Sequence, residues 1–294
     1  MNIIGHKEKR ALLRKIASGV LPHHAYLFSG PEGVGKILVA REFAAALLGC
    51  PDGDPSRKQD FLLIVPEAKK DGGKRSIPVE AVREAGLFLS RYPAESSRRV
   101  VVIDDADRMT EAAQNALLKT LEEPNSTSVL ILVSARTGAL RDTVVSRMFR
   151  VPFTHVSEED LRFGISVIAP DGHATVEPFF FSLGRPGIVA SALSDPEAFS
   201  RHRDLLRSLF KISSLSYAEL LALSEKLSQS PVEAADLFEW WVSGLRNMRK
   251  PGESRRATVR FYGLLEEIEK TIRMMRDTNA NARLLIDRLF LVSL

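Results

Sequence analysis

Residues 30–36 have the sequence GPEGVGK, a glycine-rich loop that lies between two apolar segments. The segment before it, residues 25–28, has the short apolar character of a buried strand, and the segment after it, residues 37–48, has the length and composition of a helix. Glycines permit the tight backbone path in which consecutive N–H groups and the start of a helix point at a phosphate group, and a lysine adds positive charge. The residues that we expect to form this phosphate-binding loop are Gly30, Gly33, Gly35 and Lys36.

A second apolar run, VVVI at residues 100–103, ends in two acidic residues, Asp104 and Asp105. A strand, a glycine-rich loop and a helix, followed by a strand that ends in acids, form the outline of a P-loop NTPase. In such a site the first acid supports Mg²⁺, and the next position holds an acid that polarises the attacking water. Another interpretation stays open, in which Asp104, Asp105 and Asp107 form a capped turn into the next helix.

Residues 111–124, EAAQNALLKTLEEP, are typical of a helix that carries apolar residues along one face and is stopped by Pro124. The pair Ser146-Arg147 follows downstream. The segments that accompany them are IGH at 4–6, SIPVEAVR at 76–83 and NANARLLIDRLF at 279–290. Together they resemble the clamp-loader branch of the AAA+ P-loop family, and within it the delta-prime subunits of bacterial DNA polymerase III. The resemblance is close over residues 1–155 and looser beyond them.

The alternation of strand-like and helix-like segments predicts an α/β fold with a mostly parallel sheet for residues 1–155. The expected strands are short and apolar, as in a sheet that is buried on both faces. They cover residues 25–28, 62–65, 100–103, 129–133 and 149–151. The pattern after them is helical. The resemblance implies an AAA+ P-loop core at residues 1–155, a small helical lid at 156–200 and an all-helical collar domain for oligomerisation at 201–294.

The chain has 294 residues, of which 45% are hydrophobic and 27% charged, with a formal net charge of +4. This composition is ordinary for a globular chain of two or three domains. Since no segment has the length of an apolar membrane span and no apolar leader opens the chain, we expect a cytoplasmic protein without a membrane partner. Many relatives carry a four-cysteine zinc module, but Cys50 is the single cysteine here, so we expect no zinc.

Three departures from the family pattern indicate weak nucleotide chemistry. Ile37 stands where the pattern has a Ser or Thr hydroxyl that binds Mg²⁺, and an aliphatic side chain cannot coordinate a cation. Asp105 replaces a glutamate and is one methylene shorter, and Arg185 lies early compared with the lid arginine of active motor subunits. We therefore expect no efficient ATPase activity and at most weak binding of ATP or ADP, and the sequence specifies no cofactor with certainty. An equal alternative is a loop that is kept only for its turn geometry.

Arg147 has a different role by resemblance. In clamp loaders a Ser-Arg-Cys segment lies at a subunit edge, and its arginine reaches the neighbouring ATP site, where a guanidinium stabilises the transferred phosphoryl group. Ser146 and Arg147 are present here, and Met148 replaces the cysteine. The alternative for Arg147 is an ordinary surface ion pair. Ser134, at the end of the fourth strand, is interpreted as a strand-terminal hydroxyl in preference to a polar nucleotide sensor.

The resemblance implies a subunit that joins motor subunits of the gamma or tau type and a delta subunit in a hetero-oligomeric ring. Such a ring loads a sliding clamp onto primed DNA, and this chain would present Arg147 to a neighbour. Two alternatives remain open: a competent AAA+ ATPase motor subunit of the gamma type, and a diverged AAA+ scaffold outside replication. Ile37 argues against the first, and association with a clamp loader would argue against the second.

Overall fold

The structure is a computed structural model. It describes residues 3–19, 23–50, 52–67, 75–168, 183–248, 255–278 and 280–293. The chain divides into two compact units, the first comprising Met1–Pro170 with Gly184–Ile188 and the second comprising Asp171–Leu183 with Val189–Leu294. This division is coarser than the expected core, lid and collar, which stay a prediction. The middle of the expected lid, residues 169–182, lies outside the described residues.

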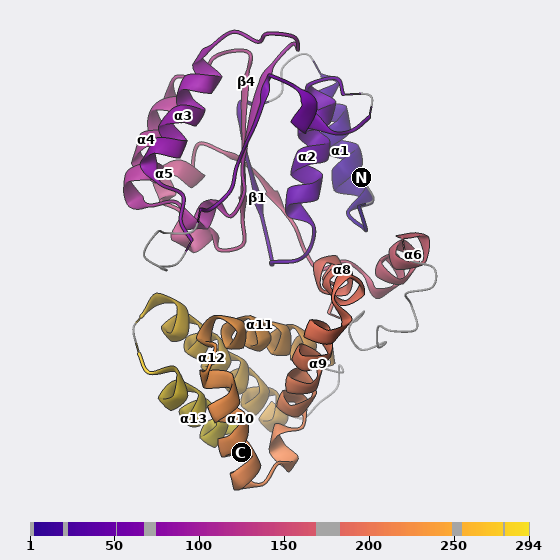
Figure 1. Cartoon of the computed structure of the whole chain (residues 1–294), viewed down its shortest axis with the longest axis vertical. Helices are drawn as coiled ribbons and strands as arrows, with labels where there is room; N and C mark the ends of the chain where they lie inside the picture. Colours follow the sequence, from indigo (N-terminus) through magenta and orange to yellow (C-terminus); the bar gives the residue numbers. More distant parts are fainter. Residues whose placement is uncertain are drawn as a thin grey trace. The chain divides into compact units, whose positions relative to one another are not determined.

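The first unit is built around a five-stranded sheet in which all strands run parallel (Figure 1). From one edge to the other, the order is β2, β3, β4, β1 and β5. The strands are β1 Ala25–Ser29, β2 Phe61–Ile64, β3 Arg99–Ile103, β4 Ser128–Ser134 and β5 Phe149–Pro152. Their bounds agree with the expected strands to within a residue, and the predicted α/β fold with a mostly parallel sheet is confirmed.

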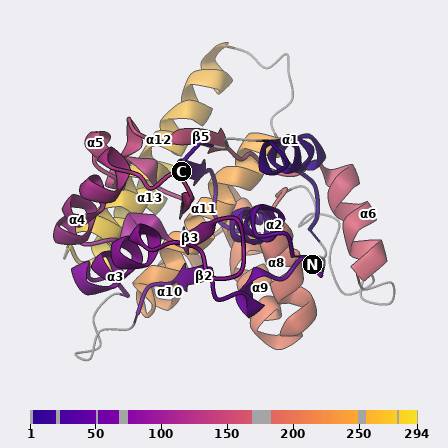
Figure 2. The same ribbon diagram turned by 90° about the horizontal axis from the view of Figure 1, so that it is seen from above.

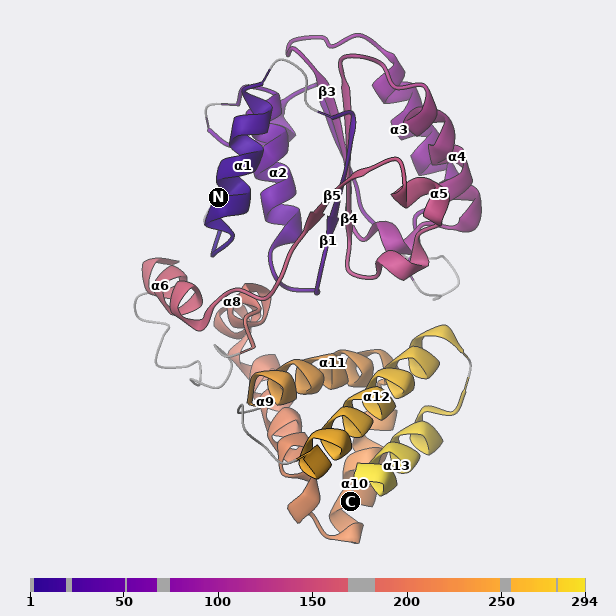
Figure 3. The same ribbon diagram turned by 180° about the vertical axis from the view of Figure 1, so that it is seen from behind.

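Helices cover both faces of this sheet, because each parallel connection must cross over one face. One face carries α1 Lys7–Ala17 and α2 Lys36–Leu47. The opposite face carries α3 Val79–Ser90, α4 Glu111–Glu122 and the short α5 Asp142–Val145 (Figure 3). Figure 2, turned by 90°, shows the same two groups of helices on either side of the strands.

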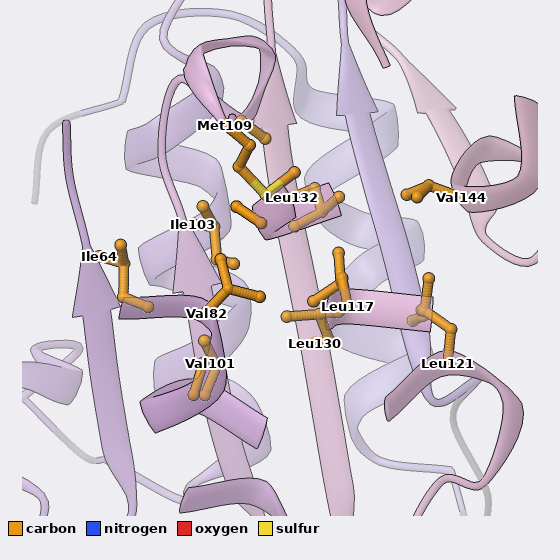
Figure 4. Close-up of a cluster of buried hydrophobic side chains, with 14 of the residues drawn as sticks. Ile64, Val82, Val101, Ile103, Met109, Leu117, Leu121, Leu130, Leu132 and Val144 are labelled. Atoms are coloured by element: carbon orange, nitrogen blue, oxygen red, sulfur yellow. The ribbon is translucent and has the colours of Figure 1, made fainter. Parts of the chain in front are cut away.

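Two apolar cores, one on each face, hold these layers together. Val101 and Ile103 of β3 pack with Val82 of α3 and Leu117 of α4 in the core of the α3–α4 face (Figure 4). Val102, which lies between the two strand residues, belongs to the opposite core with residues of α2. Alternate strand residues thus enter different cores, which explains why the central strands carry apolar residues at consecutive positions.

The ends of α4 are determined by local chemistry. The Thr110 hydroxyl caps the helix by accepting a hydrogen bond from the Ala113 N–H at 3.2 Å. Pro124 cannot continue a helix, and α4 ends at Glu122. The predicted helix at residues 111–124 is therefore confirmed, and its length separates Thr110 from Glu122 by about 18 Å along the helix axis.

The second unit is helical in its described part. Its helices are α9 Pro196–Phe210, α10 Tyr217–Ser228, α11 Pro231–Met248, α12 Arg255–Asp277 and α13 Ala282–Ser293, and α8 Pro186–Ser194 begins in the first unit and ends in the second. Phe238 and Trp241 of α11 are buried, while Arg276 of α12 forms ion pairs with Asp236 and Glu239. None of the described helices combines the length and the apolar composition that a membrane span requires.

Asp60, directly before β2, fixes the connection between α3 and β3. Its buried carboxylate accepts hydrogen bonds from the backbone N–H groups of Ala94, Glu95 and Ser96 at 2.7, 2.9 and 2.8 Å. The Arg99 guanidinium lies 3.4 Å from the same carboxylate. Burial by itself would raise the pKa of Asp60, but these donors and the positive charge lower it below its usual value.

Replacing Asp60 with alanine is expected to lower the free energy of unfolding by about 2–4 kcal/mol, because it leaves buried N–H groups and Arg99 without their acceptor. Urea denaturation followed by circular dichroism measures this change. Glu84→Ala is the control, because Glu84 is exposed on α3 and has no ion pair in the described part of the chain. Its expected change is within about 0.5 kcal/mol, and equal losses from both variants would contradict the role of Asp60.

Candidate nucleotide-binding site

The glycine-rich loop joins β1 to α2 at the carboxyl end of the parallel strands. Gly30 has a φ of 146°, and a side chain there would place its Cβ 2.2 Å from the carbonyl oxygen of Phe153. Gly35 has a φ of 92° directly before α2, a conformation that favours glycine. The backbone N–H of Gly30 donates to the Ser134 carbonyl at 3.3 Å, which ties the loop to the end of β4.

Lys36 is buried and turned back onto its own loop. Its Nζ donates to the carbonyl oxygens of Gly30 at 2.8 Å and Pro31 at 2.7 Å. Burial lowers the pKa of Lys36, and the nearby acidic side chains, Glu32 first among them, act in the opposite direction. A phosphate that binds in this loop would have to compete with the two carbonyl oxygens for the ammonium group.

Ile37 follows Lys36 in the first turn of α2. Its side chain is half-buried and packs against the apolar core of the α2 face. The position that would offer a hydroxyl to Mg²⁺ is therefore part of the hydrophobic packing, and it contributes no oxygen ligand.

Asp104 and Asp105 begin the turn after β3. The half-buried Asp104 has its pKa raised to about 6, first by burial and then by the negative charge of Asp105, while the Asp105 N–H and Lys36 act in the opposite direction. Asp105 has a φ of 46°, which is uncommon for a residue with a side chain, and its carboxylate lies 3.3 Å from Arg108. Asp104 therefore lies within the electrostatic range of Lys36, and Asp105 takes part in a local ion pair.

Asp107 has a structural role in the site that the sequence did not predict. Its carboxylate accepts hydrogen bonds from the Ser134 hydroxyl at 3.0 Å, the Ala135 N–H at 3.2 Å and Nε of Arg136 at 2.9 Å. This network joins the end of β3 to the end of β4. The Ser134 hydroxyl is fully buried and engaged in it, as the strand-terminal interpretation expects. The signal available in the sequence was the third acid of the DDAD run at residues 104–107.

Gln114 is a second such residue. It lies on the buried side of α4, where its Nε2 donates to the Ala139 carbonyl at 3.1 Å and its Oε1 accepts from the Arg141 N–H at 2.8 Å. These bonds fix the segment that leads into α5 against α4. No local pattern distinguishes a buried glutamine of this kind from an exposed one.

Two segments distant in sequence contact the loop. The N–H of Gly187 donates to the Gly33 carbonyl at 2.8 Å, and Nε2 of His6 lies 3.0 Å from the Val34 carbonyl. Arg185 is buried, and its Cβ lies 3.7 Å from the place where a Cβ on Gly33 would stand. The structure thus brings Arg185 beside the glycine-rich loop, a placement that its position in the sequence did not indicate.

Arg147 lies away from this site. It precedes β5, whose first residue Phe149 pairs in register with Tyr26, whereas the glycine-rich loop begins after Ser29. The intervening strand residues correspond to about 13 Å. The guanidinium donates through Nη1 to the Thr143 carbonyl at 2.9 Å, and Nη2 lies 2.9 Å from Glu122. The site residues predicted from the sequence therefore fall into two groups, which lie at opposite ends of the parallel strands.

The residues around Arg147 differ in exposure. Met148 is buried in the apolar core of the α3–α4 face, whereas Ser146, Arg147 and Arg150 are exposed. An apolar residue at position 148 is consistent with this packing. Of the neighbours Arg147 and Met148, the charged side chain is therefore exposed and the apolar one is buried.

Metal ligation can be assessed for the described residues. They contain no group of three or more His, Cys, Asp or Glu side chains that could hold a metal ion. Cys50 is half-buried near the end of α2, and burial raises the pKa of its thiol. The expected lack of zinc stays a prediction.

Comparison with known proteins gives the same fold and a family. The family model described as DNA polymerase III, delta subunit, matches residues 5–157. The DNA polymerase III subunit delta' of Pseudomonas aeruginosa is 31% identical over 153 residues, 47% of this chain and 45% of that protein. The tau subunit of Escherichia coli is 32% identical over 165 residues, 53% of this chain and 25% of that protein. The matches thus span less than half the length of these relatives.

A solved structure extends the likeness to almost the whole chain. A DNA polymerase III gamma subunit-related protein of Thermotoga maritima superimposes with a TM-score of 0.51. It covers 97% of this chain and 98% of that chain, at 21% identity. Since the identity is low, this likeness concerns the fold alone.

Asp104→Asn is expected to stabilise the protein above pH 6 by roughly 1–3 kcal/mol. The pKa of Asp104 is raised from 3.8 to about 6, so the folded state holds the proton more tightly, and stability decreases as the pH rises through this interval. Asparagine removes that penalty. Urea unfolding at pH 5, 6, 7 and 8 should show a gain that grows to about pH 6 and then stays constant. A variant that is less stable at every pH would contradict the raised pKa.

Proposed function

Because this chain belongs to the DNA polymerase III delta subunit family, whose model matches residues 5–157, we propose that it is a delta-prime-like clamp-loader subunit without efficient ATPase activity of its own. In this proposal it works in the cytoplasm, where it supplies Arg147 to the ATP site of a neighbouring subunit while a sliding clamp is loaded onto primed DNA. The observation that carries the proposal is the exposure of Arg147 at the end of the strands opposite to the end that holds its own glycine-rich loop.

Three features of the loop support low ATPase activity. Ile37 offers no ligand to Mg²⁺, and its half-buried side chain packs against the core. Lys36 is already bound to two loop carbonyls. Asp105, at the position expected to polarise water, is paired with Arg108. Weak binding of ATP or ADP through the loop backbone and Lys36 remains part of the proposal, because the glycines keep the phosphate-loop conformation.

The position of Arg147 supports a role in trans. A catalytic arginine must touch the transferred phosphoryl group, and about 13 Å of strand separates Arg147 from the loop of its own chain. An exposed guanidinium at this place can serve a nucleotide only if that nucleotide is bound to another subunit. The alternative is the surface ion pair with Glu122, which by itself would contribute little.

The proposed partners are motor subunits of the gamma or tau type and a delta subunit in a hetero-oligomeric ring. The likeness to a tau subunit over 165 residues supports a related architecture. Apolar side chains remain exposed on the helices of the second unit, among them Tyr217, Leu284, Leu291 and Val292. Single exposed apolar side chains are common on protein surfaces, so these four serve the proposal only as positions that a neighbouring subunit would cover in an assembly through the C-terminal helices.

A competent motor subunit of the gamma type is the other candidate function. The 32% identity to the tau subunit favours it, whereas Ile37 argues against it because the magnesium ligand is missing. A scaffold outside replication is the third alternative, and co-purification with clamp-loader subunits would exclude it.

The isolated chain is expected to show negligible Mg²⁺-dependent ATP turnover, measured by phosphate release. Ile37→Thr should restore little activity, because Asp105 remains paired with Arg108 and Lys36 with the loop. Robust turnover by the unmodified chain without motor subunits would contradict the proposal and favour the motor-subunit alternative.

Arg147→Ala is expected to leave the protein folded and the ring assembled, and to slow ATP hydrolysis and clamp loading by the ring. Arginines that act in trans contribute roughly 10³–10⁵-fold at one site, but the total rate falls less because the ring has several sites. Arg147→Lys should rescue poorly, since an ammonium group lacks the planar fork that binds two oxygens.

Arg150→Ala is the matched control for this experiment. Arg150 is exposed three residues away and forms no ion pair within the part of the chain that the structure describes. Clamp loading on primed DNA and steady-state ATPase rates should match the wild type for this variant. Equal losses from both alanine variants would reduce Arg147 to a structural residue.

A further inference from the structure

Arg147 is held by two groups that belong to different helices. Its Nη1 donates to the carbonyl oxygen of Thr143 in α5, and its Nη2 lies 2.9 Å from Oε1 of Glu122 at the end of α4. The side chains of Arg147 and Glu122 retain 38% and 51% of their exposure. The contact is therefore solvent-exposed, and it fixes one side of the guanidinium.

The place of Glu122 is determined by the packing of α4. Leu117 and Leu121 are buried in the core of the α3–α4 face, so the last turn of the helix cannot shift along the sheet. Pro124 ends the helix two residues later. Gln114 fixes the segment before α5 against the same helix through its bonds to Ala139 and Arg141. Glu122 and Arg147 therefore face each other across a rigid contact between α4 and α5.

The guanidinium keeps unused hydrogen-bond donors. Arginine has five N–H groups in a planar fork, and the two contacts with Thr143 and Glu122 engage only the terminal nitrogens. Nε has no hydrogen-bond partner in the described part of the chain. A planar group that is held along one side can present its remaining donors to phosphate oxygens without first losing its side-chain freedom.

From this geometry we propose that Glu122 is the positioning residue for Arg147: together with the Thr143 carbonyl, it orients the guanidinium for the nucleotide of the neighbouring subunit. The inference rests on the proposed function, because it assigns how the arginine of that same site is presented. Glu122 does not touch the nucleotide. It reduces the number of conformations that the long arginine side chain would otherwise have to give up on binding.

An exposed ion pair of this kind adds little to the stability of the fold. The effect of Glu122 should therefore appear in the rate of the assembled ring and only weakly in the unfolding of the chain. A residue that merely supports the fold would show the opposite pattern.

The test uses the complete ring, reconstituted with motor subunits and a delta subunit, and its ATPase rate on primed DNA with the clamp. Glu122→Gln keeps the size of the side chain and removes its charge. It is expected to lower the Arg147-dependent part of kcat roughly three- to tenfold, with KM for ATP changed less than about twofold because the nucleotide is bound by the neighbour. Size-exclusion chromatography should show intact assembly.

Glu123→Gln is the matched control, since Glu123 is the adjacent exposed carboxylate and has no ion pair among the described residues. It should leave kcat unchanged. The double variant Arg147→Ala/Glu122→Gln should be no slower than Arg147→Ala alone, because Glu122 acts only through the arginine.

The outcomes separate the inference from the function on which it rests. If Arg147→Ala slows the ring while Glu122→Gln matches the wild type or exceeds it, the positioning role is wrong and the proposed function stands. If Glu122→Gln slows the ring equally with and without Arg147, the positioning role is wrong as well. If Arg147→Ala has no effect in an intact ring, the proposed function itself fails.

Discussion

The burial of a parallel sheet on both faces is the constraint on which the first unit depends. Strands β3, β4 and β1 lie at its centre, and their apolar side chains enter one core or the other in alternation. Because the strands run in one direction, their carboxyl ends all lie at the same end of the sheet. The glycine-rich loop, the acidic turn after β3 and Ser134 at the end of β4 come together there, although they are far apart in the chain.

The polar groups at the carboxyl ends of the strands are largely bound to one another. Lys36 is engaged by its own loop, Ser134 by Asp107, and the Gly33 carbonyl by the N–H of Gly187. A nucleotide would have to replace some of these hydrogen bonds, each worth about 0.5–1.5 kcal/mol net. It would do so without a hydroxyl for Mg²⁺ at Ile37. The geometry of a phosphate loop is thus retained while the free energy available for binding phosphate is reduced.

Helix α4 runs from this end of the sheet, where the strands finish, to the opposite end, where they begin. It begins at the Thr110 cap beside the acidic turn and ends at Glu122 beside Arg147, about 18 Å away. Buried apolar residues hold the helix in place, whereas the ion pair at its end is exposed. The stability of the fold and the presentation of the arginine therefore depend on different residues of the same helix, so that the exposed pair can vary without unfolding the core.

Four features could be predicted from the sequence: the five strands, the glycine-rich loop, the helix that ends before Pro124 and the missing hydroxyl at Ile37. These features follow from local patterns: runs of apolar residues, the conformational freedom of glycine and the chemistry of single side chains. Three contacts could not be predicted and appear only in the folded chain: Asp107 with Ser134, Gly187 with Gly33 and Glu122 with Arg147. Each of these contacts joins segments distant in sequence, and it depends on which helix packs on which face and on the rotamer that the packing leaves, which no local pattern specifies.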